Sequence, residues 1–202
     1  TLSTGGHTLT IDLDLTVAGG TVDAAAGNLD ISGSVEVTGG ALIAPGSGTF
    51  TVERAFTVDA EGSFVHSGGT VTLDGDQDEE QGLGSAGSAL NNLTVAGVGE
   101  WSLVQGDLVL EGDFTQSGGL INASAATLDV GGAFTLQSNA AFDAPGGGQS
   151  LKVRGEWNAA PEAAFNPNYG LVELIDGGSS TNTITHGPGE FYKLRVAGPS
   201  AQ

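Results

Sequence analysis

A duplication constrains this chain more than any other feature of its sequence. The segment 64–97, FVHSGGTVTLDGDQDEEQGLGSAGSALNNLTVAG, returns without a gap as 165–198, FNPNYGLVELIDGGSSTNTITHGPGEFYKLRVAG, which is 101 positions later. The two segments share apolar residues and glycines, such as Phe64 with Phe165 and Gly69 with Gly170, whereas the polar residues between them differ. A shared apolar and glycine pattern indicates a shared shape rather than a shared chemical site.

The repetition extends over the whole chain. Residues 107–136 align with residues 8–37 at an offset of 99, and residues 141–148 align with residues 41–48 at an offset of 100. The chain therefore consists of two copies of a unit of about 100 residues, 1–100 and 101–202. Because the units of a repeat protein depend on their neighbours, we expect one continuous rod instead of two separate cores.

A shorter period lies inside each copy. The pattern apolar-x-apolar recurs at steps of 20 to 23 residues, with a single step of 15 between Leu93 and Leu108. The short step indicates either a shortened turn or a different register at that point. The pattern occurs ten times, at Leu9-Ile11, Leu29-Ile31, Phe50-Val52, Val71-Leu73, Leu93-Val95, Leu108-Leu110, Leu128-Val130, Leu151-Val153, Val172-Leu174 and Leu194-Val196.

This period predicts an all-β parallel β-solenoid with about ten coils of 20–22 residues. No segment has the i, i+3, i+4, i+7 apolar spacing of a helix. Glycines follow nearly every expected strand, where their access to positive φ suits a sharp corner. We expect right-handed winding, because parallel crossover connections are overwhelmingly right-handed.

Equivalent positions of successive coils should form ladders along the rod. One inward ladder is expected at Leu15, Val35 and Phe56, and in the second copy at Phe114, Phe134 and Trp157. Another is expected at Val22, Leu42 and Phe64, and in the second copy at Ile121, Phe142 and Phe165. The expected outward ladder is too mixed for the flat threonine surface of an ice-binding protein; it contains Thr10, Asp30, Thr51, Thr72, Thr94, Val109, Asp129 and Lys152.

The charge balance argues against two classes of partner. The chain has 24 acidic and 5 basic residues and a net charge of −19, which disfavours nucleic acids and anionic membranes because both require cationic contacts. No run of 18 apolar residues predicts a membrane span, and the absence of cysteine excludes disulfides and thiolate metal sites. The acidity indicates a solvated surface. Adaptation to a salty habitat and the binding of divalent cations are more specific interpretations of the same charge.

One acidic cluster has the spacing of a metal-binding loop. Asp74, Asp76 and Asp78 occupy positions 1, 3 and 5 of a calcium loop, and hard oxygen ligands suit calcium. Glu79 stands where that loop has glycine, Ser85 stands where it has glutamate, and the cluster is absent from the second copy. We therefore expect an acidic surface loop that binds calcium no tighter than the millimolar range, and no other cofactor.

No group of residues predicts catalysis. The three histidines fall at different phases of the repeat, which suggests surface loops, and there is no Gly-x-Ser-x-Gly elbow. Acidic residues are spread along the rod, whereas a glycosidase needs converging carboxylates. Lys152 with Arg154 and Lys193 with Arg195 should place basic side chains on the outer surface of two strands. They would suit an acidic polymer or simple ion pairing.

The repeated skeleton resembles that of a known class of proteins. Phe-x-x-Ser-Gly-Gly-x-Val-x-Leu-x-Gly at 64–75, followed by Asn-Asn-Leu-x-Val-x-Gly at 91–97, resembles the strand repeats of filamentous-haemagglutinin-like and autotransporter-like adhesins of bacterial surfaces. The resemblance covers nearly the whole chain and implies an extracellular or cell-surface location with a structural or adhesive role. It implies no catalytic residue.

Two functions from different classes remain open. The first is a non-enzymatic structural segment of an extracellular protein or filament, acting as a stalk, adhesin or self-assembling fibre. The alternative is a carbohydrate-active β-helix enzyme or polysaccharide-binding module. Neither end of the sequence has a polar cap, a helix or a proline-rich stop, so we expect further copies to join in tandem or end to end. A surface polysaccharide is a second expected partner.

Overall fold

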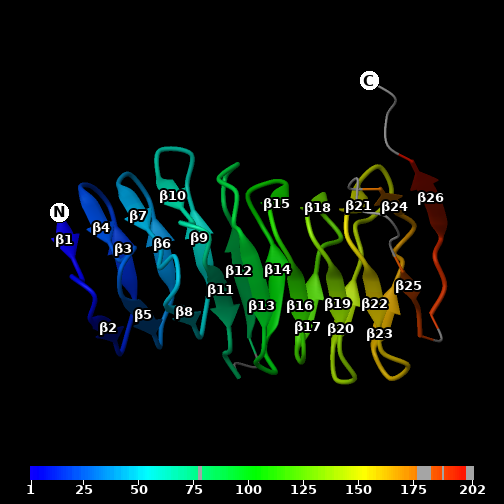
Figure 1. The fold of residues 1–202 in the computed structure, drawn as a ribbon, viewed down its shortest axis with the longest axis horizontal. Helices are drawn as coiled ribbons and strands as arrows, with labels where there is room; N and C mark the ends of the chain where they lie inside the picture. The colour runs from blue at the N-terminus through cyan, green and yellow to red at the C-terminus, as the bar shows by residue number, and fades with distance from the viewer. Residues whose placement is uncertain (77–78, 177–182, 188, 199–202) are drawn as a thin grey trace.

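The chain winds into a parallel β-solenoid (Figure 1). The computed structural model describes residues 1–76, 79–176, 183–187 and 189–198. Every pairing between strands in this part of the chain is parallel, and none of these residues is helical. The predicted fold class is therefore confirmed. The winding hand stays a prediction.

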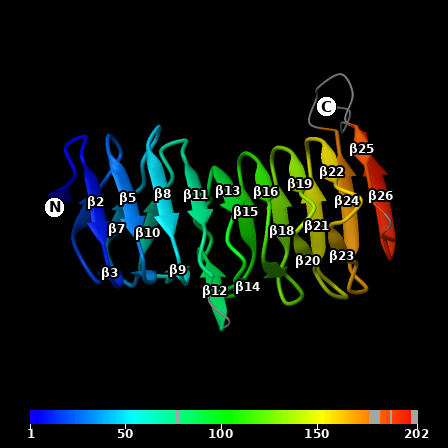
Figure 2. The ribbon, with the colours of Figure 1, turned by 90° about the horizontal axis from the view of Figure 1, so that it is seen from below.

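Two sheets run the length of the rod, and Figure 2 shows the longer one with its strands side by side. We name this sheet B; its strands in order are β2 (Thr8–Ile11), β5 (Asn28–Ile31), β8 (Thr49–Val52), β11 (Thr70–Leu73), β13 (Asn92–Val95), β16 (Phe114–Gln116), β19 (Phe134–Leu136), β22 (Trp157–Ala159) and β25 (Ile184–Thr185). Sheet C contains β3 (Leu15–Val17), β6 (Val35–Val37), β9 (Phe56–Val58), β12 (Glu80–Gly84), β14 (Glu100–Leu103), β17 (Leu120–Asn122), β20 (Ala141–Asp143) and β23 (Ala164–Asn166).

Two shorter sheets share the third face of the rod (Figure 1). Sheet A contains β1 (Leu2–Ser3), β4 (Thr21–Asp23), β7 (Ala41–Ile43) and β10 (Ser63–Val65). Sheet D contains β15 (Leu108–Leu110), β18 (Leu128–Val130), β21 (Ser150–Val153), β24 (Leu171–Ile175) and β26 (Lys193–Ala197). Between the two sheets, Leu90 forms a single bridge to Leu110.

The described strands complete about nine turns, because sheet B contains nine strands. The sequence pattern suggested ten, and the difference comes from the 15-residue step. Leu93 lies in β13 of sheet B, whereas Leu108 lies in β15 of sheet D. The step therefore crosses from one face to the third face without completing a turn.

This incomplete turn shifts the second copy by one face relative to the first. Strands β1 to β13 correspond in order to β14 to β26, and each strand lies on a different face from its counterpart. For example, β3 of sheet C corresponds to β16 of sheet B, and β10 of sheet A corresponds to β23 of sheet C. Sheets B and C nevertheless run unbroken across the boundary between the copies, where β13 pairs with β16 and β12 pairs with β14.

The predicted inward ladders exist within each copy, but they do not continue from the first copy to the second. Val35 pairs with Leu15 and Phe56 in sheet C, whereas Phe134 pairs with Phe114 and Trp157 in sheet B. The second ladder behaves likewise, in sheet A for the first copy and in sheet C for the second. All twelve residues are buried, because alternate positions of a strand face the same side.

Glycine permits close contact between successive turns at the corner that precedes β11 in the first copy and β24 in the second. A Cβ atom on Gly69 would lie 1.9 Å from the carbonyl oxygen of Pro45, and one on Gly170 would lie 1.8 Å from that of Pro145. Neither glycine is among the residues with positive φ. Tight stacking, and not an unusual backbone conformation, therefore explains these two glycines.

Polar side chains at strand starts also connect successive turns. Asp14 accepts a hydrogen bond from the backbone N–H of Ser34, and its counterpart Asp113 accepts one from Ala133. Similar bonds reach the next turn from Asn28, Asn92 and Asp107. Part of the outward polar surface therefore has a structural role.

Candidate functional site

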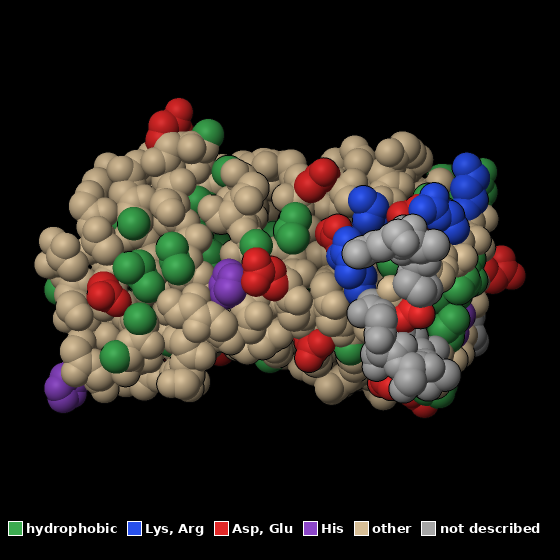
Figure 3. Space-filling model, turned by 45° about the horizontal axis from the view of Figure 1, so that its top comes forward, with side chains coloured by type: hydrophobic (Ala, Val, Ile, Leu, Met, Phe, Trp, Pro, Cys, Tyr) green, Lys and Arg blue, Asp and Glu red, His purple; other side chains and the backbone are tan. Residues whose placement is uncertain are grey.

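The outer surface of sheet D carries alternating charges. The register places Val109, Asp129, Lys152, Glu173 and Arg195 in one file across five strands. Lysine and arginine side chains (blue) gather on the right-hand side of the molecule in Figure 3. The expectation that Lys152 with Arg154 and Lys193 with Arg195 lie on the outer surface of two strands is confirmed by the register for Lys152 and Arg195. β24 lies between those two strands.

Acidic neighbours pair with the two arginines of this surface. Arg154 hydrogen-bonds both carboxylate oxygens of Asp129, and that contact raises the pKa of Arg154 above its ordinary value. Arg195 lies 3.1 Å from a carboxylate oxygen of Glu173. Glu173 is buried between cationic neighbours, which is the arrangement a buried carboxylate requires.

Two exposed tyrosines lie beside these charges. The rings of Tyr169 and Tyr192 meet edge to face with 5.1 Å between centroids, and Lys193 Nζ lies 5.6 Å from the Tyr192 centroid. Tyr169 is 71% exposed and Tyr192 is 52% exposed, so both rings are available to a ligand. A shallow pocket between the strands is lined by Gly148, Gln149, Ser150, Tyr169, Leu171 and Lys193.

Tyr169 adopts an unfavourable backbone conformation. Its φ is +63°, in the left-handed region that bulky residues rarely occupy. The counterpart in the first copy is Gly68, with a φ of +85°, and glycine has no such penalty. A strained aromatic residue on an exposed corner is the kind of departure that accompanies functional sites.

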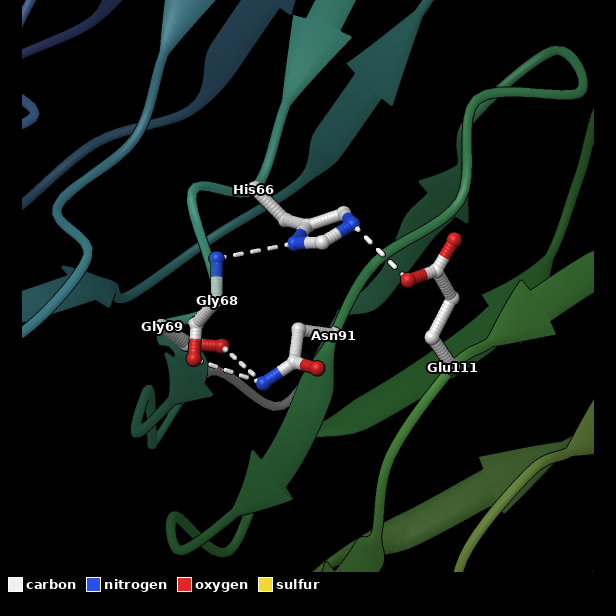
Figure 4. Close-up of polar contacts among 5 residues, drawn as sticks. All are labelled: His66, Gly68, Gly69, Asn91 and Glu111. Atoms are coloured by element: carbon white, nitrogen blue, oxygen red, sulfur yellow. Dashed lines mark hydrogen bonds and ion pairs between the residues drawn. The ribbon is translucent and has the colours of Figure 1, made fainter.

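A small polar cluster lies on the third face of the rod, between sheets A and D (Figure 4). His66 Nδ1 accepts a hydrogen bond from the Gly68 N–H at 2.9 Å, and His66 Nε2 lies 3.4 Å from a Glu111 carboxylate oxygen. Asn91 donates to the carbonyl oxygens of Gly68 at 2.6 Å and Gly69 at 3.3 Å. These bonds connect the end of sheet A with the start of sheet D, so we assign the cluster a structural role.

The other two histidines are in different environments. His7 is exposed, as expected for a surface loop. His186 also lies in a loop but is half-buried: its ring stacks on Phe191 with 4.4 Å between centroids, and its Nδ1 accepts a hydrogen bond from Trp157 Nε1 at 3.2 Å. His186 Nε2 is buried and has no hydrogen-bond partner among the residues that the structure describes. Its place in an aromatic cluster could not be derived from its phase in the repeat.

The predicted calcium residues are only partly within the described chain. Asp74 and Asp76 are exposed, and Asp78 lies outside the described residues. Partial burial raises the pKa of Asp74, and the nearby charges of Glu53 and Asp30 raise it further. No group of three histidine, cysteine or acidic residues that could hold a metal ion occurs in the described ranges. Calcium binding at Asp74, Asp76 and Asp78 stays a prediction.

The predicted outward ladder is wrong after Thr94. Sheet B continues it with Thr115 and Thr135 instead of Val109 and Asp129, so five successive strands carry threonine. Threonine is favoured on exposed strand surfaces because it is β-branched. A flat threonine surface would need a second row of hydroxyl side chains two positions before this one. Two positions before Thr115, Thr135 and Asn158, however, the chain has Asp113, Ala133 and Glu156.

Sequence reasoning missed the tyrosine pair. Tyr169 and Tyr192 lie among the residues that differ between the two copies, and the repeat pattern assigns no role to such residues. A comparison of charge and aromatic content at equivalent outward positions would have found them.

Comparison with protein-family models, curated proteins and solved structures found no match to this chain. None of the described residues belongs to a helix with the length and apolar character needed to cross a bilayer.

Proposed function

We propose that this chain is a non-enzymatic structural segment of an extracellular or cell-surface protein, acting as a stalk, adhesin or self-assembling fibre. One observation carries the proposal: the residues that the copies share are those that stack the turns. Phe64 and Phe165 are both buried, and the Asp14 and Asp113 carboxylates connect turns in the same way. Duplication has therefore extended a rod without repeating a candidate chemical site.

The proposed stalk joins further copies of itself at its last turn. Leu194 and Val196 of β26 are 44% and 69% exposed, whereas their counterparts Leu93 and Val95 in β13 are 1% and 0% exposed. The difference arises because β16 pairs with β13 at the boundary between the two copies. The same apolar strand of the repeat is therefore buried in the first copy, where it is β13, and exposed in the second copy, where it is β26.

The boundary inside the chain gives the geometry of the proposed contact. Inside the chain, β13 of the first copy pairs with β16 of the second copy. Because β26 is the counterpart of β13 and β3 is the counterpart of β16, β3 of a second molecule should pair with β26. Leu15 would then cover Leu194, and Val17 would cover Val196. This contact would be wholly apolar, whereas the internal boundary pairs Val95 with the polar Gln116. β26 pairs with β24 along one side, and no described strand pairs with its other side; an apolar edge of this kind is a template for strand addition.

Cysteine cross-linking tests this contact, because the chain has no cysteine of its own. By the internal pairing of Thr94 with Thr115, Arg195 should face Thr16 of a second molecule. Paired strands lie about 4.8 Å apart, which suits a disulfide. The variant with Arg195→Cys and Thr16→Cys should form a ladder of multimers on a non-reducing gel after oxidation.

Two matched variants complete the experiment. The pair Thr94→Cys and Thr115→Cys should close within one molecule and shows that the geometry permits a disulfide. The pair Arg195→Cys and Thr10→Cys places the second cysteine on a different face and should give no ladder. Absence of a ladder from the Arg195 and Thr16 pair, or an equal ladder with Thr10, would refute the proposed joining.

A further inference from the structure

The second copy differs from the first in a consistent way on one surface. Six outward positions carry basic or aromatic residues in the second copy, and none of their counterparts in the first copy is basic or aromatic. These six residues, which we call the basic-aromatic patch, are Lys152, Arg154, Tyr169, Tyr192, Lys193 and Arg195; their counterparts are Thr51, Glu53, Gly68, Asn91, Asn92 and Thr94. Four basic and two aromatic residues at neighbouring sites of one copy alone indicate a function that the first copy lacks.

The fold brings these positions together on one surface. β21 and β26 of sheet D carry the four basic residues, with β24 between them. Tyr169 precedes β24, Tyr192 precedes β26, and their rings are in contact. The patch holds four of the five basic residues of a chain whose net charge is −19. Its acidic neighbours in the sheet register are Asp129 and Glu173.

We infer that the basic-aromatic patch binds an anionic polysaccharide. Exposed tyrosine rings offer an apolar surface for the C–H faces of sugar rings together with a hydroxyl group. Lys193 supplies a cation beside the ring of Tyr192, and the pocket next to it adds the hydroxyl of Ser150 and the amide of Gln149. Ammonium, hydroxyl and amide donors together suit carboxylate or sulfate groups on a sugar.

The charge of the remaining molecule limits how the polymer lies. Acidic residues elsewhere repel a polyanion, so the contact is confined to the end of sheet D and involves a short stretch of sugars. The backbone strain at Tyr169 supports the same assignment, because its exposed ring contacts Tyr192 on the surface and does not pack into the apolar interior that stabilises the fold. This inference goes beyond the proposed structural role and does not depend on end-to-end joining.

Calorimetric titration with defined polymers tests the inference. The probes are polygalacturonate as a carboxylated polysaccharide, dextran sulfate as a sulfated one, uncharged dextran, and polyglutamate as an acidic polymer without sugars. The protein should bind at least one of the two anionic polysaccharides, with an affinity that falls as salt is added, and should bind neither dextran nor polyglutamate comparably. Which of the two anionic polymers binds more tightly identifies the anionic group.

Reversion to first-copy residues supplies the variants. Tyr169→Gly and Lys193→Asn should each weaken binding about tenfold or more, which corresponds to the loss of one charge-assisted or well-packed contact. Tyr169→Gly should melt at or above the temperature of the parent, because glycine tolerates the left-handed conformation. Its loss of binding therefore cannot come from unfolding. Arg54→Gln, which changes the one basic residue outside the patch, should bind as the parent does.

Several outcomes would overturn the inference. Failure to bind either anionic polysaccharide, or parental affinity in both Tyr169→Gly and Lys193→Asn, removes the patch as a site. Equal weakening by Arg54→Gln would mean that total charge decides binding. Comparable binding of polyglutamate would mean that sugars are not recognised. None of these results affects the cross-linking of Arg195 with Thr16, so the two proposals fail separately.

Discussion

At the scale of single residues, the distance between backbones of successive turns decides which side chains are allowed. Gly170 and Gly69 lie so close to a carbonyl of the preceding turn that one methyl group would overlap it. Gly147 lies at a neighbouring corner, and a Cβ atom there would meet nothing within 4 Å. The same residue type therefore has opposite tolerance at the same corner, between sheets C and D, of two successive turns.

We expect Gly170→Ala to destabilise the protein by about 1–3 kcal/mol, the usual cost of an extra methylene group in packed surroundings. The reason is the clash with the Pro145 carbonyl oxygen, which can be relieved only by a backbone shift. Thermal unfolding followed by circular dichroism measures the change. The control Gly147→Ala should alter stability by less than about 0.5 kcal/mol. Equal melting temperatures for the two variants would contradict the packing explanation.

The sequence could predict the strands because buried and exposed residues alternate in it. Phe134 and Leu136 face inward with Thr135 between them, and spacing alone reveals this. Spacing does not reveal which face a strand occupies, so the step from Leu93 to Leu108 could not be assigned to two faces of the rod. Contacts between distant residues, such as the Tyr169 and Tyr192 rings, depend on how the turns stack and were likewise hidden.

At the scale of elements, aromatic side chains of the second copy stack along sheet B. The Phe134 ring lies between Phe114 at 4.9 Å and Trp157 at 4.7 Å, and both neighbours are nearly parallel to it. Phe142 meets the same ring edge to face at 5.1 Å from the adjacent sheet. Such pairs add to the free energy gained by burial alone. Strands β16, β19 and β22 therefore depend on one another.

We expect Phe134→Ala to destabilise the protein by about 3–5 kcal/mol, as is typical when a buried phenylalanine is truncated. The cavity would lie in the middle of the stack, where neighbouring turns cannot collapse into it. Denaturant unfolding gives the free energy. The control Thr135→Ala lies on the same strand with an outward side chain and should cost less than about 1 kcal/mol. A similar loss for both variants would mean that the Phe134 ring is not buried.

At the scale of the whole molecule, net charge opposes the stacking of turns. Acidic residues lie along the rod, and only five basic residues offset them. Repulsion among like charges favours expanded over compact states. The rod therefore owes its stability to the apolar interior and the ladder hydrogen bonds, while its surface charges act against the fold.

We expect salt to stabilise the protein. Raising sodium chloride from about 0.01 M to about 1 M shortens the Debye length from roughly 30 Å to roughly 3 Å, so repulsion among the carboxylates should weaken and the melting temperature should rise. Potassium chloride at equal concentration should act alike, since screening depends on ionic strength. A melting temperature that is constant or falls with salt would contradict a destabilising role for the surface charge.

The shift of one face between copies has a consequence for any rod made of several of them. Each residue would reappear one copy later at a different azimuth, a third of the circumference away, and would return to its first direction only with every third copy. A patch confined to one side of one copy would thus trace a spiral around the fibre. Such a fibre would present the patch in every direction around its axis.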